Sequence, residues 1–91
     1  MKFTLEVGTQ ERHQIEFEFN QLLGRSVLKV DGREVFRKNR WFSEPIVESY
    51  DVEISGRDQI RMRIVKERRL LVSSRYKVYV DNRLTQLYQG A

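Results

Sequence analysis

Apolar and polar residues alternate with a period of two through most of this chain. Phe3, Leu5 and Val7 alternate with Thr4 and Glu6. The same alternation recurs in residues 15–19, 28–30, 50–54, 60–64 and 76–80. An extended strand with this pattern turns one face to a core and the other to water, as the strands of antiparallel sheets do. Because no segment keeps the apolar spacing of a helix, we predict an all-β protein.

The strand-like runs are separated by turn signals, and the pattern occurs twice. Asp31-Gly32 and Asp81-Asn82 are pairs that suit the positive φ angles of tight hairpin turns. The stretch R12HQIEFEF19 is similar to R57DQIRMRI64, and F3TLEV7 is similar to Y50DVEI54. We therefore predict two units of about forty residues, each with four strands.

A four-stranded unit of this kind exposes its apolar face when it stands alone, whereas two units can bury those faces against each other. The predicted fold is an eight-stranded antiparallel β-sandwich that forms a single domain over residues 1–91. Residues 41–49 are the predicted crossing segment, and they contain the only proline, Pro45.

Composition narrows the class of protein. The chain has 91 residues, a net charge of +4 and no cysteine, so disulfides, thiolate nucleophiles and zinc–cysteine sites are excluded. The amino terminus lacks the apolar core of a signal peptide, and no apolar run reaches the ~20 residues of a membrane span. We expect a cytoplasmic protein that does not bind membranes.

Several stretches resemble the Fas apoptosis inhibitory molecule family. H13QIEFEF19 is similar to a strand of the amino-terminal domain of that family, and V27LKVDGREVFRKNRWF42 to its hairpin and the continuation of that hairpin. D51VEISGRDQIRMRI64 and V78YVDNRLTQLY88 resemble its second-half strands and closing hairpin. The resemblance covers nearly the whole chain, although animal members have two such domains in tandem and differ after Trp41-Phe42.

This resemblance implies an eight-stranded antiparallel β-sandwich that is not an enzyme and works through protein contacts. The animal members resemble modulators of death-receptor signalling and protectors against aggregation, so a stress- or signalling-related role is the corresponding expectation.

The residues themselves indicate no catalytic, metal or cofactor site. His13 is the only histidine, and no serine has a spacing that ties it to His13 as a nucleophile would need. Glu6, Glu16 and Glu18 are explained as outward-facing strand residues, with Glu6 and Glu16 expected to face each other. We therefore predict a non-enzymatic protein without a cofactor.

A basic nucleic-acid-binding module is the alternative function. Its contacts would come from a basic loop, K66ERR69, and the strand after it: Lys66, Arg68, Arg69, Arg75 and Lys77. If Ile54 faces Ile60, however, Glu53 faces Arg61 and Asp51 faces Arg63. Such pairs cancel much of the positive field, so nucleic acid is the less favoured partner.

A protein partner of unknown identity is the favoured one. The candidate contact residues form a basic and aromatic segment: Arg37, Lys38, Arg40, Trp41 and Phe42. Trp41 has two interpretations, a plug that closes one end of the core or an exposed anchor. The strand near Leu84–Tyr88 is a second candidate, because an edge strand can pair with a partner strand or with a second copy in a homo-oligomer.

Overall fold

The structure is a computed structural model in which residues 1–20, 23–39, 47–57, 59–68 and 73–90 are described. The chain divides into two compact units, Met1–Glu44 and Pro45–Ala91. Every regular element in the described residues is a β-strand, as predicted. Among these residues, no helix has the length and apolar character needed to cross a membrane.

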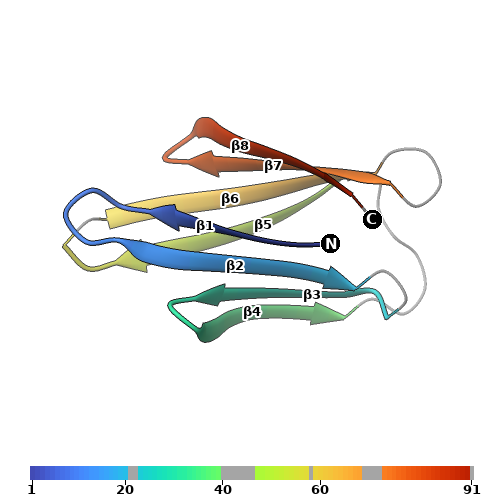
Figure 1. The fold of residues 1–91 in the computed structure, drawn as a ribbon, viewed down its shortest axis with the longest axis horizontal. Coiled ribbons are helices and arrows are strands. Elements are labelled where there is room, and N and C mark those ends of the chain that lie inside the picture. Colours follow the sequence, from blue (N-terminus) through green and yellow to red (C-terminus); the bar gives the residue numbers. More distant parts are fainter. Residues whose placement is uncertain (21–22, 40–46, 58, 69–72, 91) are drawn as a thin grey trace. The chain divides into compact units, whose positions relative to one another are not determined.

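The amino-terminal unit is a four-stranded antiparallel sheet in the order β1-β2-β3-β4 (Figure 1). Its strands are β1 (Lys2–Val7), β2 (His13–Asn20), β3 (Arg25–Val30) and β4 (Arg33–Asn39). Each strand pairs with the next one in sequence, so the unit is a simple meander.

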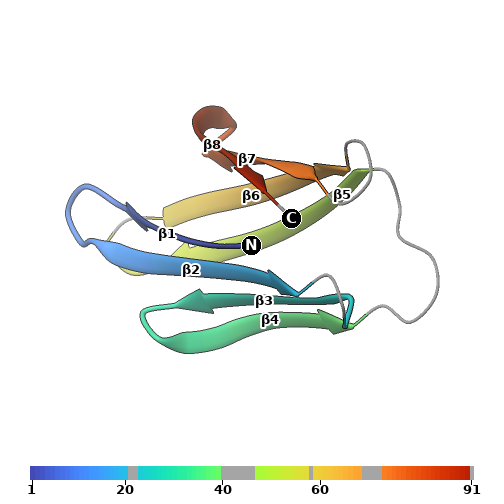
Figure 2. The ribbon, with the colours of Figure 1, turned by 45° about the vertical axis from the view of Figure 1, so that its right-hand side comes forward.

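The carboxyl-terminal unit repeats this arrangement in the order β5-β6-β7-β8 (Figure 2). Its strands are β5 (Val47–Ser55), β6 (Gln59–Arg68), β7 (Ser74–Val80) and β8 (Arg83–Gly90). The predicted eight antiparallel strands in two four-strand units are confirmed. The predicted crossing segment, residues 41–49, is too long, since β5 already begins at Val47.

Alternate residues of the inner strands are buried, which follows from the period-two pattern. The buried apolar side chains of the first unit are Phe3, Val7, Ile15, Phe17, Phe19, Val27 and Leu28. Those of the second unit are Tyr50, Ile54, Ile60, Met62, Ile64, Tyr76 and Val78. The rings of Phe3 and Phe17 pack with their centroids 5.3 Å apart.

The two hairpin turns have the same construction. Asp31 and Asp81 adopt φ angles of 53° and 50°, and each is followed by a second residue with positive φ, as two-residue hairpin turns require. The carboxylate of Asp31 accepts a hydrogen bond of 2.8 Å from the Gln14 amide, and that of Asp81 accepts one of 3.1 Å from the Arg61 amide. Each aspartate therefore ties its turn to the strand beside it.

Strand register defines which residues of the two units correspond. Ile15 pairs with Leu5 and Val30, and Met62 pairs with Val52 and Val80, so Ile15 corresponds to Met62. The similarity between R12HQIEFEF19 and R57DQIRMRI64 instead matches Ile15 with Ile60, so the correspondence predicted from the sequence is wrong by two residues. A shift of two keeps the alternation in phase, and for this reason the sequence pattern did not reveal the error.

Two further expectations about charged residues are corrected. Glu6 pairs with Gln14 and Glu16 with Thr4, so Glu6 and Glu16 do not face each other. Residues 66–68 belong to β6 and not to a loop, and Lys66 is only 2% exposed. The predicted pairs Glu53–Arg61 and Asp51–Arg63 are confirmed, with nitrogen–oxygen distances of 3.5 and 2.7 Å.

Candidate functional site

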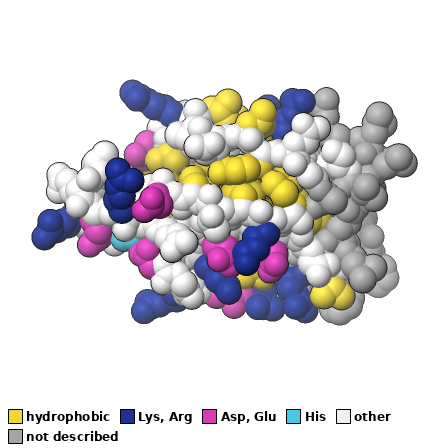
Figure 3. All heavy atoms as spheres, in the orientation of Figure 1, with side chains coloured by type: hydrophobic (Ala, Val, Ile, Leu, Met, Phe, Trp, Pro, Cys, Tyr) yellow, Lys and Arg dark blue, Asp and Glu magenta, His cyan; other side chains and the backbone are white. Residues whose placement is uncertain are grey.

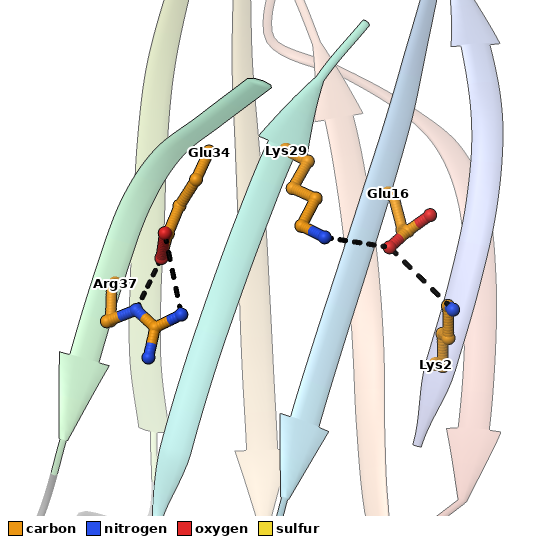
Figure 4. Close-up of polar contacts among 5 residues, drawn as sticks. All are labelled: Lys2, Glu16, Lys29, Glu34 and Arg37. Carbon is orange, nitrogen blue, oxygen red and sulfur yellow. Dashed lines mark hydrogen bonds and ion pairs between the residues drawn. The ribbon is translucent and has the colours of Figure 1, made fainter. Parts of the chain in front are cut away.

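The outer face of the first sheet carries charges of alternating sign. Glu16 on β2 lies 3.7 Å from Lys2 on β1 and 3.9 Å from Lys29 on β3 (Figure 4). Lys29 is in turn the register partner of Glu34 on β4. The opposite charges of this row largely neutralise one another, so the row presents no strong electrostatic field to a charged ligand.

Only part of the predicted basic and aromatic segment lies within the described residues. Arg40, Trp41 and Phe42 lie outside the described residues, so neither interpretation of Trp41 is tested. Arg37 and Lys38 are exposed residues of β4. The Arg37 guanidinium donates hydrogen bonds to both carboxylate oxygens of Glu34, from Nε and Nη2 (Figure 4). The hydrogen bond from Arg37 lowers the pKa of Glu34 below its usual value.

A β-bulge makes this ion pair possible. Residues three apart in a regular strand point to opposite faces. Here Leu28 pairs with Phe36 and Lys29 pairs with Glu34, so Val35 is an extra residue without a register partner. The bulge restores Glu34 and Arg37 to the same face of β4, side by side.

The second unit has the same bulge at the same place. Val78 pairs with Gln86 and Tyr79 pairs with Leu84, which makes Thr85 the extra residue. The Thr85 hydroxyl donates a 3.1 Å hydrogen bond to the carbonyl oxygen of Val78. By this register, Leu84 corresponds to Glu34, and Leu87 corresponds to Arg37.

The second unit therefore places two leucines where the first unit has a hydrogen-bonded ion pair. Leu84 is 55% exposed and Leu87 is 56% exposed. We call these two residues the leucine pair. Large aliphatic side chains that are more than half exposed next to each other are a feature of interaction surfaces.

The leucine pair lies on an edge strand. β8 is the last strand of its sheet, and in the described part of the chain only β7 pairs with it. Beside the leucine pair on β7 are Tyr79, opposite Leu84, and Lys77, opposite Leu87. The site thus combines two exposed leucines with an edge strand whose second side is paired with no other strand in the described residues.

Comparison with known proteins identifies the family. The model of the family described as Fas apoptotic inhibitory molecule (FAIM1) matches residues 2–90. This chain belongs to the Fas apoptotic inhibitory molecule family. A search of curated proteins finds no match. The match confirms the resemblance inferred from the sequence, and it covers both units of this family domain.

In this Fas apoptotic inhibitory molecule domain, the described residues among those predicted for nucleic-acid contact are not all available on one basic surface. Lys66 is buried, and Arg69 lies outside the described residues. Lys77 on β7 is paired with Glu67 on β6, at 3.3 Å between Nζ and Oε2. Arg68 is exposed, and Arg75 is partly exposed. On the face drawn in Figure 3, acidic side chains lie among the basic ones.

The sequence analysis missed a buried polar row in the second unit. Glu48, Lys66 and Tyr76 are register partners across β5, β6 and β7, and they are 7%, 2% and 0% exposed. The Tyr50 hydroxyl donates a hydrogen bond to Glu48 Oε1. The signal was present in the alternation, because Lys66 continues the phase of Ile60, Met62 and Ile64.

His13, the only histidine of this family domain, is held between two carboxylates. Its Nδ1 lies 2.7 Å from Asp31 Oδ2, and its Nε2 lies 3.1 Å from Glu11 Oε1. The hydrogen bond with Asp31 is the main reason why the pKa of His13 is raised above 6.5. Among the described residues, no group of three or more His, Cys, Asp or Glu side chains is arranged to bind a metal ion.

Proposed function

We propose that this domain is a non-enzymatic protein-interaction module that binds a partner protein through the β8 edge. The observation that carries the proposal is the leucine pair. Leu84 and Leu87 occupy positions where the same bulged hairpin in the first unit has Glu34 and Arg37. The corresponding positions of the first unit hold two charged residues that pair with each other. The geometry of the hairpin therefore does not require two exposed leucines at these positions.

The open edge supplies the second part of the interaction. A partner strand that adds to β8 gains main-chain hydrogen bonds, while pockets and exposed side chains select its sequence. The leucine pair would then be covered by apolar side chains of the added strand. A contact of this kind fits the role in stress or signalling that family membership suggests.

The other two function classes have less support. A nucleic-acid module would need several of its basic residues on one free surface, but Lys66 is buried and Lys77 is paired with Glu67. For an enzyme, the single histidine would be the natural base. His13 is instead engaged by the turn residue Asp31 and by Glu11, which supports a structural role for it.

Affinity capture from lysate of the source organism tests this proposal. The bait proteins are the wild-type chain and the variant Leu84→Glu/Leu87→Arg, which transfers the ion pair of the first unit to β8. We expect a protein that is captured by the wild type with nuclease present and that is lost with the variant. Circular dichroism and thermal unfolding of both baits serve as the folding control.

A reverse variant provides the matched control. Glu34→Leu/Arg37→Leu changes the corresponding positions of β4 and leaves β8 untouched, so it should retain the captured protein. Capture that disappears with nuclease, or that survives the β8 substitutions, would contradict the proposal.

A further inference from the structure

We propose that His13 is a pH-dependent clamp: its charged imidazolium ties the β1–β2 loop to the β3–β4 turn through Glu11 and Asp31, and loss of its proton releases Glu11. The loop consists of residues 8–12. In the antiparallel meander of the first unit, this loop and that turn lie at the same end of the sheet (Figure 1). His13, the first residue of β2, is 8% exposed. The clamp involves no residue of β8, so it is independent of the proposed function.

Each ring nitrogen of His13 has a carboxylate oxygen within ion-pair distance. Nδ1 lies 2.7 Å from Asp31 Oδ2, and Nε2 lies 3.1 Å from Glu11 Oε1. An ionised carboxylate can only accept a hydrogen bond, whereas a neutral imidazole has one N–H group and one lone pair. Only the imidazolium, with two N–H groups, can face both carboxylates favourably. The arrangement is therefore that of the charged form.

Among the described residues, Asp31 and Glu11 are the charged groups that act on the imidazole. On β1 the register partner of His13 is Val7, a buried apolar residue. The hydrogen bond with Asp31 contributes most to raising the pKa of His13 above 6.5, and it outweighs burial, which acts in the opposite direction. The clamp should therefore be closed at pH 5.5 and should open as pH rises through the raised value.

The contact with Asp31 should survive deprotonation, and the contact with Glu11 should not. Asp31 is held by two 2.8 Å hydrogen bonds with the backbone of Gln14, one to its carboxylate and one from its own amide. Glu11 lies in a loop, and its side chain is 45% exposed, so water can replace the imidazole. Nε2 is shielded from solvent, and a lone pair there would have no donor while Glu11 stayed in place. The neutral ring should keep its proton on Nδ1 and release Glu11.

The second unit shows that this kind of turn forms without a clamp. Ile60, a buried apolar residue, corresponds to His13 by strand register. Asp81 still accepts a 3.1 Å hydrogen bond from the Arg61 amide. An imidazole is therefore not needed to build the hairpin turn. What His13 adds in the first unit is a link between the turn and a loop, and that link depends on pH.

Nitrogen-15 NMR of the histidine ring tests the inference on the intact domain. The chain has one histidine, and the shifts of its two ring nitrogens report which of them carries a proton. At pH 5.5 both should be protonated, and nuclear Overhauser contacts should connect the ring with the side chains of Asp31 and Glu11. At pH 8.5 Nδ1 should remain protonated, and Nε2 should show the large downfield shift of a bare ring nitrogen. Only the contacts with Glu11 should be lost.

The variant Glu11→Gln distinguishes a clamp from a contact that is merely structural. A side-chain amide can accept a hydrogen bond through its oxygen or donate one through its nitrogen, so it can face either form of the ring. This variant should keep the contacts between residue 11 and the ring at both pH values, and the titration midpoint of His13 should fall. Glu6→Gln is the matched control, because the Glu6 carboxylate lies 3.8 Å from Arg12 and not beside the imidazole. That variant should titrate as the wild type does.

Three results would overturn the inference. A neutral ring with its proton on Nε2 would make Asp31, and not Glu11, the contact that opens. Wild-type contacts between the ring and Glu11 that persist unchanged at pH 8.5 would show that the clamp does not open. Equal changes in Glu11→Gln and Glu6→Gln would show a general effect of charge at this end of the sheet.

Discussion

At the scale of single residues, the two units use equivalent positions differently. Asp31 and Asp81 both accept a hydrogen bond from the strand beside their turn, but only Asp31 also binds a histidine. By strand register the residue that corresponds to His13 is Ile60, an apolar core residue. The first unit therefore contains a titratable contact between β2 and a hairpin turn, and the second unit has an apolar side chain there.

The contact between His13 and Asp31 makes the stability of the protein depend on pH. Because the pKa of His13 is raised in the folded state, its charged form contributes stability below pH 6.5, and this contribution is lost as pH rises through the folded pKa. The free energy of unfolding of the wild type relative to His13→Gln should therefore be larger at pH 5.5 than at pH 8.5. Urea unfolding at both values measures this difference.

Proton NMR gives a direct check on the same residue. The chain has one histidine, so the imidazole resonance belongs to His13 without further assignment. Its titration midpoint should lie above 6.5 in the wild type and should move down in Asp31→Asn, which removes the charge of the hydrogen-bond acceptor. A wild-type midpoint at or below 6.5 would refute this interpretation of the contact.

The buried polar row leads to a second prediction at residue scale. Glu48 and Lys66 correspond to Met1 and Phe19, an apolar pair whose backbones exchange hydrogen bonds of 3.0 and 2.8 Å. Lys66→Ala leaves a buried carboxylate beside the missing charge, so it should destabilise the protein by about 3–5 kcal/mol. Glu48→Met/Lys66→Met removes both charges and should recover most of this loss in chemical denaturation. A double variant as unstable as Lys66→Ala would contradict this explanation.

At the scale of elements, the two bulged hairpins, β3–β4 and β7–β8, show which features a sequence can predict. The alternation predicted the strands, and the Asp-Gly and Asp-Asn pairs predicted the turns, because both depend on residues close together in the chain. The bulges at Val35 and Thr85 carry no such local signal. Without the bulge, Leu84 and Leu87 would be placed on opposite faces of β8, and so the leucine pair could not be recognised from the sequence.

The turns allow a prediction on stability. Gly32 has a φ of +80°, and an added Cβ would meet no atom within 4 Å, so substitution there has a backbone cost and no steric one. Gly32→Ala should destabilise the protein by about 1–2 kcal/mol, the usual cost of left-handed conformation for an L-residue. Gly32→Asn should cost less, since Asn82 occupies the corresponding turn position with φ 67°. Thermal unfolding of the two variants would separate these values, and equal losses would contradict the argument.

At the scale of the whole molecule, the two units of the repeat differ in the side chains of their last strands. Both sheets end in an exposed bulged strand, β4 in the first and β8 in the second. β4 carries the Glu34–Arg37 ion pair and three further charged or amide side chains, whereas β8 carries the leucine pair and a single charged residue, Arg83. The comparison between the units is thus an internal control, and it is the basis of the proposal that β8 binds a partner protein.

Hydrogen exchange with mass spectrometry tests this central claim most directly. The domain is measured alone and in complex with the protein that affinity capture retains. We predict slower exchange of the amides of residues 84–90 in the complex and unchanged exchange in residues 33–39, because only β8 gains a neighbouring strand. Protection of residues 33–39 with no change in residues 84–90 would contradict the claim that β8 is the interaction edge.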